Sequence, residues 1–246
     1  MQTRAPTAPA GRRRAARAAA AEGRLLDAAE ALFARHGYNG VSIRDIAGAA
    51  RANISSVYYH FGSKQHLLEA VCRRRMLPVV AERAAAMAAA GGRRASLDRL
   101  VAAFVGPTLR AAQGRGRDAA MFRRLAGHLA TDPTPEVRRA IRAIFDESVR
   151  AFVDGLRAGA AGGDAVGFFW SVACAMGAAV YVQGDLAHLA RMLGRPGRPP
   201  DTKRGLEHIA RFIRGGVEAT SRRKPASGGA LAVARPCRGS GGPQGA

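Results

Sequence analysis

The sequence predicts an all-α fold, in which a short three-helix domain precedes a larger helical bundle. Three observations support this fold class. Apolar residues recur at spacings of three and four, no run of alternating β-branched residues appears, and Gly- or Pro-rich breaks divide the chain into segments of helical length. A chain of 246 residues that is 48% hydrophobic is also long enough to form a sizeable core.

The first helix is predicted from an apolar stripe that ends at His36-Gly37. Gly37 suits a left-handed C-cap, because glycine adopts positive φ without steric cost. The stripe consists of Leu25, Leu26, Ala29, Leu32 and Phe33. Its spacing places all five side chains on one face, so this helix is expected to pack against the two that follow.

The second and third helices are predicted from their N-caps. Ser42 precedes the second helix, and Asp45 three residues later completes a short-acid variant of the capping box. After a turn, Asn53 is a good N-cap for a third helix over 54–61, which Gly62 ends. Their shared inner face is expected to consist of Ile43, Ile46, Ala47, Ala50, Ile54 and Val57.

The fourth helix begins at Lys64 and reaches Leu77, where Pro78 is expected to kink or end it. A domain boundary is therefore placed near 73–78. Further helices are expected over about 95–113, 118–130, 134–158, 164–184 and 202–219. Short loops between helices of this length are typical of an antiparallel bundle.

The two ends of the chain are basic and poor in large apolar residues, which indicates tails. The predicted organisation is a disordered basic tail over 1–22, a helix-turn-helix domain over 23–72, a helical bundle over 73–221 and a disordered tail over 222–246. Residues 165–184 carry no charge and are long enough to cross a bilayer, but their Gly, Ser and Gln residues favour a buried or dimer-forming helix. No membrane association is therefore expected.

The charge and the cysteines restrict the class of partner and site. The net charge is +21, from 39 Lys and Arg against 18 Asp and Glu, so an anionic partner such as nucleic acid is tested first. The three scattered cysteines include no CxxC pair, which argues against a disulfide framework or a zinc site. A cytoplasmic, nucleoid-associated protein with no cofactor is expected.

The second and third helices have the geometry of a unit that inserts a helix into the major groove of DNA. The outward side chains are predicted to be Arg44, Asn53, Ser55, Ser56 and Tyr58, with Tyr59, His60 and Lys64 placed to hold phosphates. No acidic residue occurs between Asp45 and Glu69, so this segment presents only neutral or positive groups to a phosphate backbone.

Three linked blocks of this region resemble the TetR family of bacterial transcriptional repressors across Arg24 to Arg75. The blocks are AAEALFARHGY over 28–38, VSIRDIA over 41–47 and VYYHFGSK over 57–64. The resemblance implies operator contacts for Ser42, Arg44, Asn53, Ser55, Ser56, Tyr58, Tyr59, His60 and Lys64. One departure is Arg51, which stands where the family frequently has glycine, so the turn is either less tight or gains a phosphate contact.

The C-terminal part resembles the PsrA-type branch of the same family, in the stretches FRRL over 122–125, TDPTPE over 131–136, FFW over 168–170 and MGA over 176–178. That branch responds to long-chain fatty acids or their acyl-CoA thioesters, which implies a small hydrophobic effector. Candidate cavity residues are Phe104, Met121, Phe122, Leu125, Phe145, Phe152, Trp170 and Met176. Ordinary core packing is the alternative for all of them. Arg123, Arg124 and His128 are candidates for a carboxylate head group.

Dimerisation is expected because one short reading helix covers only a few base pairs of double-stranded operator DNA. The last two long helices are the predicted homodimer interface. It would combine Phe169, Val172, Ala173, Met176 and Val180 with Leu206, Ile209, Ile213 and Val217. The resulting hypothesis is a ligand-released repressor.

The alternatives are a regulator of an efflux pump that senses hydrophobic drugs and a non-specific nucleoid protein. An enzyme is not expected, because the sequence contains no nucleophile elbow, phosphate loop or metal-spaced histidines.

Overall fold

The structure is a computed structural model that describes residues 8–159, 164–184, 186–195 and 201–221. These residues form α-helices and one short 3-10 helix, with no strand among them, so the all-α prediction is confirmed. The helices are α1 (Ala8–His36), α2 (Ile43–Ala49), α3 (Ile54–Phe61), α4 (Lys64–Ala89), η1 (Gly92–Arg94), α5 (Leu97–Gln113), α6 (Gly116–Thr131), α7 (Pro135–Gly159), α8 (Ala165–Tyr181), α9 (Leu186–Met192) and α10 (Thr202–Ser221).

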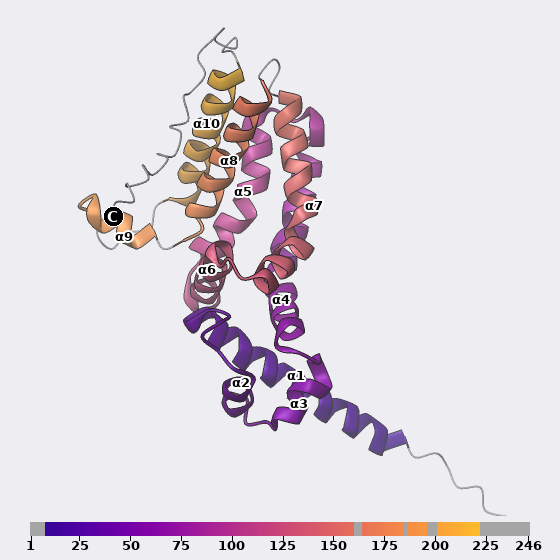
Figure 1. Cartoon of the computed structure of the whole chain (residues 1–246). Helices are drawn as coiled ribbons and strands as arrows, with labels where there is room; N and C mark the ends of the chain where they lie inside the picture. Colours follow the sequence, from indigo (N-terminus) through magenta and orange to yellow (C-terminus); the bar gives the residue numbers. More distant parts are fainter. Residues whose placement is uncertain (1–7, 160–163, 185, 196–200, 222–246) are drawn as a thin grey trace, which may run out of the picture.

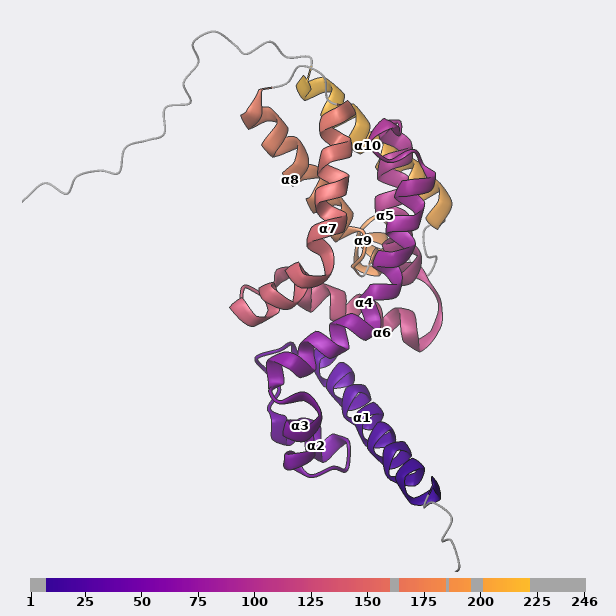
Figure 2. The same cartoon turned by 90° about the vertical axis from the view of Figure 1, so that its right-hand side faces the viewer.

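The molecule is elongated, with α1, α2 and α3 at one end and the bundle of α5, α7, α8 and α10 at the other (Figure 1). Helix α4 runs from the three-helix end into the bundle, where it packs on α5 and α7. Helix α6 lies between the two ends and packs on α1 (Figure 2). The α2–α3 pair is therefore carried at the tip of the molecule, away from the bundle.

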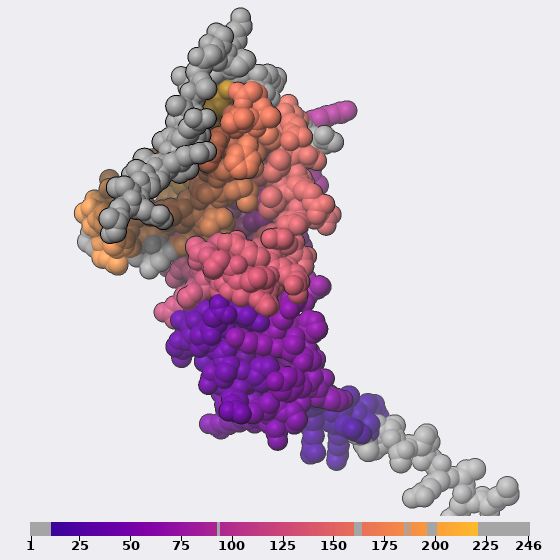
Figure 3. All heavy atoms as spheres, in the orientation of Figure 1, coloured from indigo at the N-terminus to yellow at the C-terminus, as the bar shows by residue number. Residues whose placement is uncertain are grey.

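The prediction of a disordered tail over 1–22 is wrong for residues 8–22, which belong to α1. Alanine and arginine are among the best helix formers, so this Ala- and Arg-rich segment extends the helix although it has little core to bury. Its first turns project beyond the body of the three-helix domain (Figures 2 and 3). Residues 1–7 and the tail predicted over 222–246 lie outside the described residues.

Pro78 lies inside α4 and does not end it. A proline in a helix removes one backbone hydrogen bond, here the one to the carbonyl of Arg74. Pro78 is exposed, so water can solvate that carbonyl, and the helix also packs against α5 and α7. The boundary predicted near 73–78 thus falls within one continuous helix that joins the two ends of the molecule.

The buried apolar residues form two clusters. The first is built on Phe33, Ile46 and Val57 of the three-helix domain and Leu68 of α4, and it includes Phe122, Leu125 and Leu129 of α6 and Val137 and Ile144 of α7. The second, in the bundle, includes Leu100, Phe104, Phe152, Leu156 and Ile213. Helix α6 and the start of α7 thus pack with the three-helix domain, although the sequence placed them in the separate bundle.

Candidate nucleic-acid interface and ligand cavity

The start of α2 is fixed by a complete capping box, as predicted. The Asp45 amide donates to Ser42 Oγ at 3.1 Å, and the Ser42 amide donates to Asp45 Oδ2 at 2.8 Å. Ser42 Oγ also donates to Asp45 Oδ2 at 2.7 Å. These hydrogen bonds from Ser42 hold the pKa of the Asp45 carboxyl below its usual range. Ser42 therefore acts as a helix cap at the exposed end of α2.

The turn between α2 and α3 is a Schellman motif with Arg51 at its left-handed position. The Ala52 amide donates to the Ala47 carbonyl at 2.9 Å, and the Arg51 amide donates to the Gly48 carbonyl at 3.1 Å. Arg51 has φ of 50°, so the turn keeps the tight geometry that glycine would favour. Of the two outcomes expected for Arg51, a looser turn is therefore wrong, and its exposed side chain remains free to meet a phosphate.

Replacing Arg51 with glycine is expected to raise the free energy of unfolding by about 0.5–1 kcal/mol, because a left-handed conformation costs a non-glycine residue roughly 1–2 kcal/mol, partly offset by the greater unfolded-state entropy of glycine. Urea unfolding measures this change. The matched control is Ala49→Gly, in the same helix end but at ordinary helical φ, which should lose about 1 kcal/mol. Equal destabilisation by both changes would contradict the strain assigned to Arg51.

The inner faces of α2 and α3 pack largely as predicted. Ile46, Ala47, Ala50 and Val57 are buried, whereas Ile54 is 37% exposed at the edge of the cluster. This packing fixes the direction of the outer face. On that face Arg44, Asn53, Ser55, Tyr58 and Tyr59 are exposed, and Ser56 is half-buried.

The outer face of α3 begins at its N-cap. Asn53 is exposed, and its Oδ1 accepts a hydrogen bond from the Ser55 amide at 3.1 Å, which caps α3. Tyr58 is 53% and Tyr59 80% exposed, which is unusual for large aromatic side chains in the absence of a partner. The structure thus brings small hydroxyl, amide and phenol groups together on one short, capped helix.

His60 and Lys64 are less available than the other predicted contact residues. The His60 side chain is 10% exposed, its Nδ1 lies 4.0 Å from Glu22 Oε2 of α1, and its ring meets Tyr59 edge to face. Lys64 Nζ lies 4.1 Å from the centre of the Tyr38 ring, and burial lowers the pKa of its ammonium. His60 therefore orients α3 against α1, while Lys64 is half-buried at the edge of the face.

A cavity of about 260 Å³ lies where the two buried clusters meet. Its walls come from α4, α5, α6, α7 and α8. Of the candidate cavity residues, the structure places Phe104, Phe122, Phe145 and Met176 on these walls. This volume is slightly below the range of about 300–1,000 Å³ that is typical of ligand pockets, so the cavity suits a compact ligand.

The other four candidates do not line the cavity. Leu125 and Phe152 are fully buried core residues, and the Phe152 ring stacks on Phe104 with centroids 4.0 Å apart. Met121 packs against the first cluster. Trp170 is 61% exposed on the outer face of α8, beside Phe169. Helical spacing predicted that these residues are apolar contacts but did not separate cavity wall from core or surface.

The candidates for a head-group contact also lie elsewhere. Arg123 Nη1 donates to the Ala112 carbonyl at 2.6 Å, Arg124 is exposed, and His128 lies against Gly37 in the turn after α1. The buried cation of the cavity wall is Arg83 of α4, which is only 3% exposed. Arg83 was not among the predicted site residues, although the spacing of Met76, Val79, Arg83 and Met87 places it on the core-facing stripe of α4.

The predicted dimer residues divide into two sets. Ile213 and Val217 of α10 are buried within the chain, and Leu206 and Ile209 pack against the same cluster, because this face of α10 covers α5. Val172 and Met176 of α8 also face inward. The exposed stripe of α8 instead includes Val166, Phe169, Trp170, Ala173, Gly177, Val180 and Tyr181. Helix α8 lies at the bundle surface (Figure 3), so this apolar stripe is open to a partner.

The residues that the structure describes contain neither a candidate metal site nor a membrane-spanning helix. No cluster of His, Cys, Asp or Glu in this part of the chain has the geometry to hold a metal ion. None of the helices there combines the length and hydrophobicity needed to span a bilayer.

Comparisons with known proteins agree with this geometry. Residues 25–71 match the family model described as bacterial regulatory proteins, tetR family, and residues 102–216 match the model of the tetracyclin repressor-like C-terminal domain. The HTH-type transcriptional repressor SCO4008 of Streptomyces coelicolor is 43% identical over 58 residues, which are 24% of this chain and 30% of that protein. The match therefore spans less than a third of the relative.

Two solved structures share the architecture over most of the chain. The fatty acid degradation regulator FadR from Bacillus halodurans has a TM-score of 0.55 at 16% identity, covering 80% of this chain and 95% of that one. NalD of Pseudomonas aeruginosa, the secondary repressor of the MexAB-OprM multidrug efflux pump, has a TM-score of 0.55 at 20% identity, covering 81% and 97%. At these identities the similarity establishes the fold.

Proposed function

Because the chain belongs to the TetR family of bacterial transcriptional regulators, we propose that it is a homodimeric repressor that binds a palindromic operator and leaves it when a small apolar effector fills the cavity. The observation that carries this proposal is the outer face of α3, a short capped helix with exposed hydroxyl, amide and phenol groups and no acidic residue. Such a face suits the major groove, whose edges it can read and whose phosphates it does not repel.

The contact residues have different proposed roles. Arg44 can bind a guanine edge through two hydrogen bonds, and Ser55 and Ser56 can contact base edges or allow close approach. Tyr58, Tyr59, Lys64 and the exposed Arg51 would position the domain on the backbone. The projecting start of α1 adds the exposed Arg13, Arg14 and Arg17, which strengthen attraction to any duplex.

Helix α8 supports the dimer part of the proposal. It is apolar nearly all round, with one face packed on the chain and the other exposed. The small residues Ala173 and Gly177 lie in the middle of the exposed stripe, where a second helix can approach closely. A second copy related by two-fold symmetry would cover this stripe and present two α3 helices to successive grooves about 34–36 Å apart or a near multiple.

The route from cavity to DNA runs through α4 and the turns beside α1. Helix α4 starts beside the reading helix and supplies Met76 and Arg83 to the cavity wall. Beside it, Asn39 Nδ2 donates to Thr134 Oγ1 at 2.7 Å, which ties the turn after α1 to the start of α7. An effector that shifts these contacts would change the spacing of the two reading helices. A coupling of about 1–3 kcal/mol lowers operator affinity roughly 5- to 150-fold.

The class of effector has two candidates. The resemblance of the C-terminal part to fatty-acid-responsive regulators favours a fatty acid or acyl-CoA, and the apolar cavity walls are compatible with a hydrocarbon chain. Regulation of an efflux pump by a hydrophobic drug is the alternative, since the fold is shared with a regulator of fatty acid degradation and with a repressor of an efflux pump.

The proposal predicts a preference of about 10³ or more for the operator over a random duplex at physiological salt. Arg44→Ala should relax the preference at one base pair, at a cost of about 1–3 kcal/mol for the preferred base. Lys64→Ala should weaken binding to all duplexes alike and flatten the salt dependence by about one ion. Fluorescence anisotropy with operator and scrambled duplexes over a salt series measures all three quantities.

Three outcomes would overturn parts of this assignment. Comparable affinity for operator and scrambled duplexes would favour a non-specific nucleoid protein. Equal loss of discrimination from Arg44→Ala and Lys64→Ala would show that the division between reading and positioning residues is wrong. Operator affinity that is unchanged by every apolar ligand tested would remove the effector-sensing part.

A further inference from the structure

Arg83 is a buried cation inside an otherwise mainly apolar cavity. We propose that this cavity binds a monocarboxylic acid with a compact hydrocarbon tail, and that the Arg83 guanidinium is the counter-ion of its carboxylate. This inference rests on the proposed effector-responsive function and specifies the chemistry of the effector.

The first observation is that the chain provides Arg83 with too few partners. Its Nη1 donates to Ser148 Oγ at 3.2 Å and its Nη2 donates to Thr108 Oγ1 at 2.5 Å. Both partners are neutral hydroxyls, and the buried Nε has no hydrogen-bond acceptor. A guanidinium has five N–H groups, so three of them remain available. Within the described ranges, no carboxylate oxygen lies within 4.0 Å of this guanidinium.

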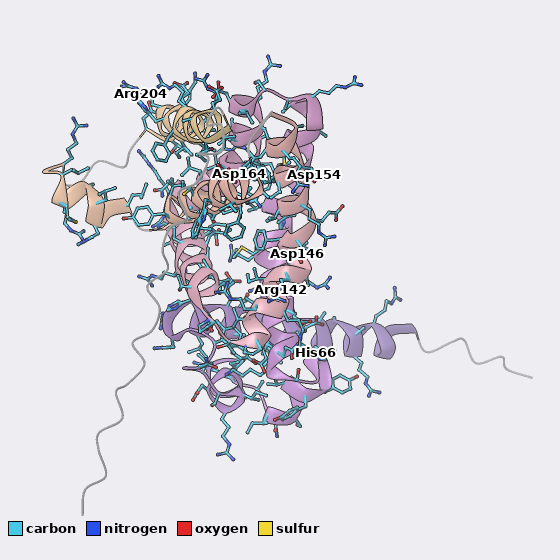
Figure 4. The ribbon with its side chains drawn as sticks, turned by 45° about the horizontal axis from the view of Figure 1, so that its top comes forward. His66, Arg142, Asp146, Asp154, Asp164 and Arg204 are labelled. Atoms are coloured by element: carbon cyan, nitrogen blue, oxygen red, sulfur yellow. The ribbon has the colours of Figure 1, made fainter. Side chains whose placement is uncertain are left out.

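The second observation is the electrostatic balance of the cavity. Besides Arg83, the charged residues on its walls are Arg138, which is half-buried, and Asp146, which is exposed on α7 (Figure 4). The walls therefore carry one more positive than negative charge. The ring centre of Phe104 lies 4.2 Å from Arg83 Cζ, and that of Phe145 lies 5.6 Å from it. These cation–π contacts compensate the buried charge only in part. Burial lowers the pKa of Arg83 to about 10, so the side chain remains protonated at neutral pH.

The third observation is the apolar surface and the volume of the rest of the cavity, which restrict the class of ligand. A planar carboxylate accepts two parallel hydrogen bonds from one guanidinium, and its single charge matches the single excess charge of the cavity. The side chains of Val79, Ile141 and Met176 offer apolar surface for a tail. The volume of about 260 Å³ suits a free acid of moderate length rather than an enclosed acyl-CoA, whose thioester also lacks the carboxylate.

If Arg83 had a purely structural role, replacing it would lower the melting temperature of the protein. A buried cation without a carboxylate partner usually destabilises a fold, and its replacement by an apolar residue of similar volume is often neutral or stabilising. Arg83→Met should therefore retain or raise the melting temperature of the apo protein. A group kept in place at a cost to stability is typical of a binding site.

The test compares three ligands that share one tail. Isothermal titration calorimetry of the full-length chain with octanoate, 1-octanol and octylammonium should show that octanoate binds about tenfold or more tightly than octanol, and that octylammonium binds more weakly than either. In Arg83→Met, octanoate should lose this advantage, while octanol binds within about threefold of its wild-type affinity. Retained octanol binding also shows that the cavity of the variant is folded.

The matched control is Arg142→Met, which removes the same charge from an exposed position on α7 (Figure 4) and should leave the octanoate preference unchanged. Equal binding of octanol and octanoate by the wild type would overturn the proposal. So would a preference that persists in Arg83→Met, or no saturable binding of acids of about six to twelve carbons. Operator binding without ligand is measured separately, so failure of the repressor assignment is distinguishable from failure of this one.

Discussion

Replacing Trp170 with glutamate is expected to convert the protein into a monomer and to lower its operator affinity by about 10²–10⁴-fold, the gain that two linked binding modules have over one. Trp170 is 61% exposed within the exposed stripe of α8. A carboxylate there would be desolvated against the apolar stripe of the second copy, which is strongly unfavourable. Sedimentation equilibrium gives the oligomeric state, and anisotropy gives the operator affinity.

The control for this experiment is Ala84→Glu, which adds the same charge to an exposed position of α4, the helix that packs on α5 and α7. It should remain dimeric and bind the operator normally. Trp170 is the one tryptophan in the chain, so dilution of the wild type should shift its emission to longer wavelength as the dimer dissociates. A Trp170→Glu protein that remains a dimer would place the interface on another surface.

Replacing Phe152 with alanine is expected to lower the free energy of unfolding by about 3–5 kcal/mol, the usual cost of deleting a buried aromatic ring. The Phe152 side chain is fully buried, and its ring stacks on Phe104 at 4.0 Å, so its removal leaves a void inside the second cluster. Denaturant unfolding at a fixed protomer concentration measures the change, because the stability of a dimer depends on concentration.

The comparison is Phe145→Ala, in which the side chain is half-buried on the cavity wall. This variant should lose less free energy of unfolding than Phe152→Ala, but its affinity for octanoate should differ from that of the wild type. If Phe145→Ala were the more destabilising change, the division between core and cavity wall would be wrong. Together, the two variants separate packing from ligand recognition among residues that look alike in the sequence.

Some parts of the fold were predictable because their causes are local. The capping box of Ser42 and Asp45 acts within four residues, and Asn53 caps α3 in the same way. Gly37 takes positive φ directly after α1, as expected for a C-cap. The turn residues and the apolar spacing then fix the face that α3 presents, which is why most of the DNA-contact candidates were found exposed.

Other expectations were wrong because a second physical effect outweighed the local feature from which they were predicted. The basic start of α1 indicated a tail by its charge, but its helix propensity prevailed. Pro78 was expected to kink or end α4, and the helix does not end there, where it packs on α5 and α7. Arg83 stands in an Ala-rich stretch and was not among the predicted site residues, because a sequence does not show which helix faces enclose a cavity.

The amino-acid sequence by itself determined α2 and α3, their caps and the acid-free reading face, since hydrogen bonds and side-chain spacing within a few residues set all three. Only the tertiary structure decided which apolar side chains fill the core, which border the cavity and which remain open to a second copy. Burial depends on the neighbours that other helices bring, so Ile213 was enclosed, Trp170 was left exposed and Arg83 was placed inside the cavity wall.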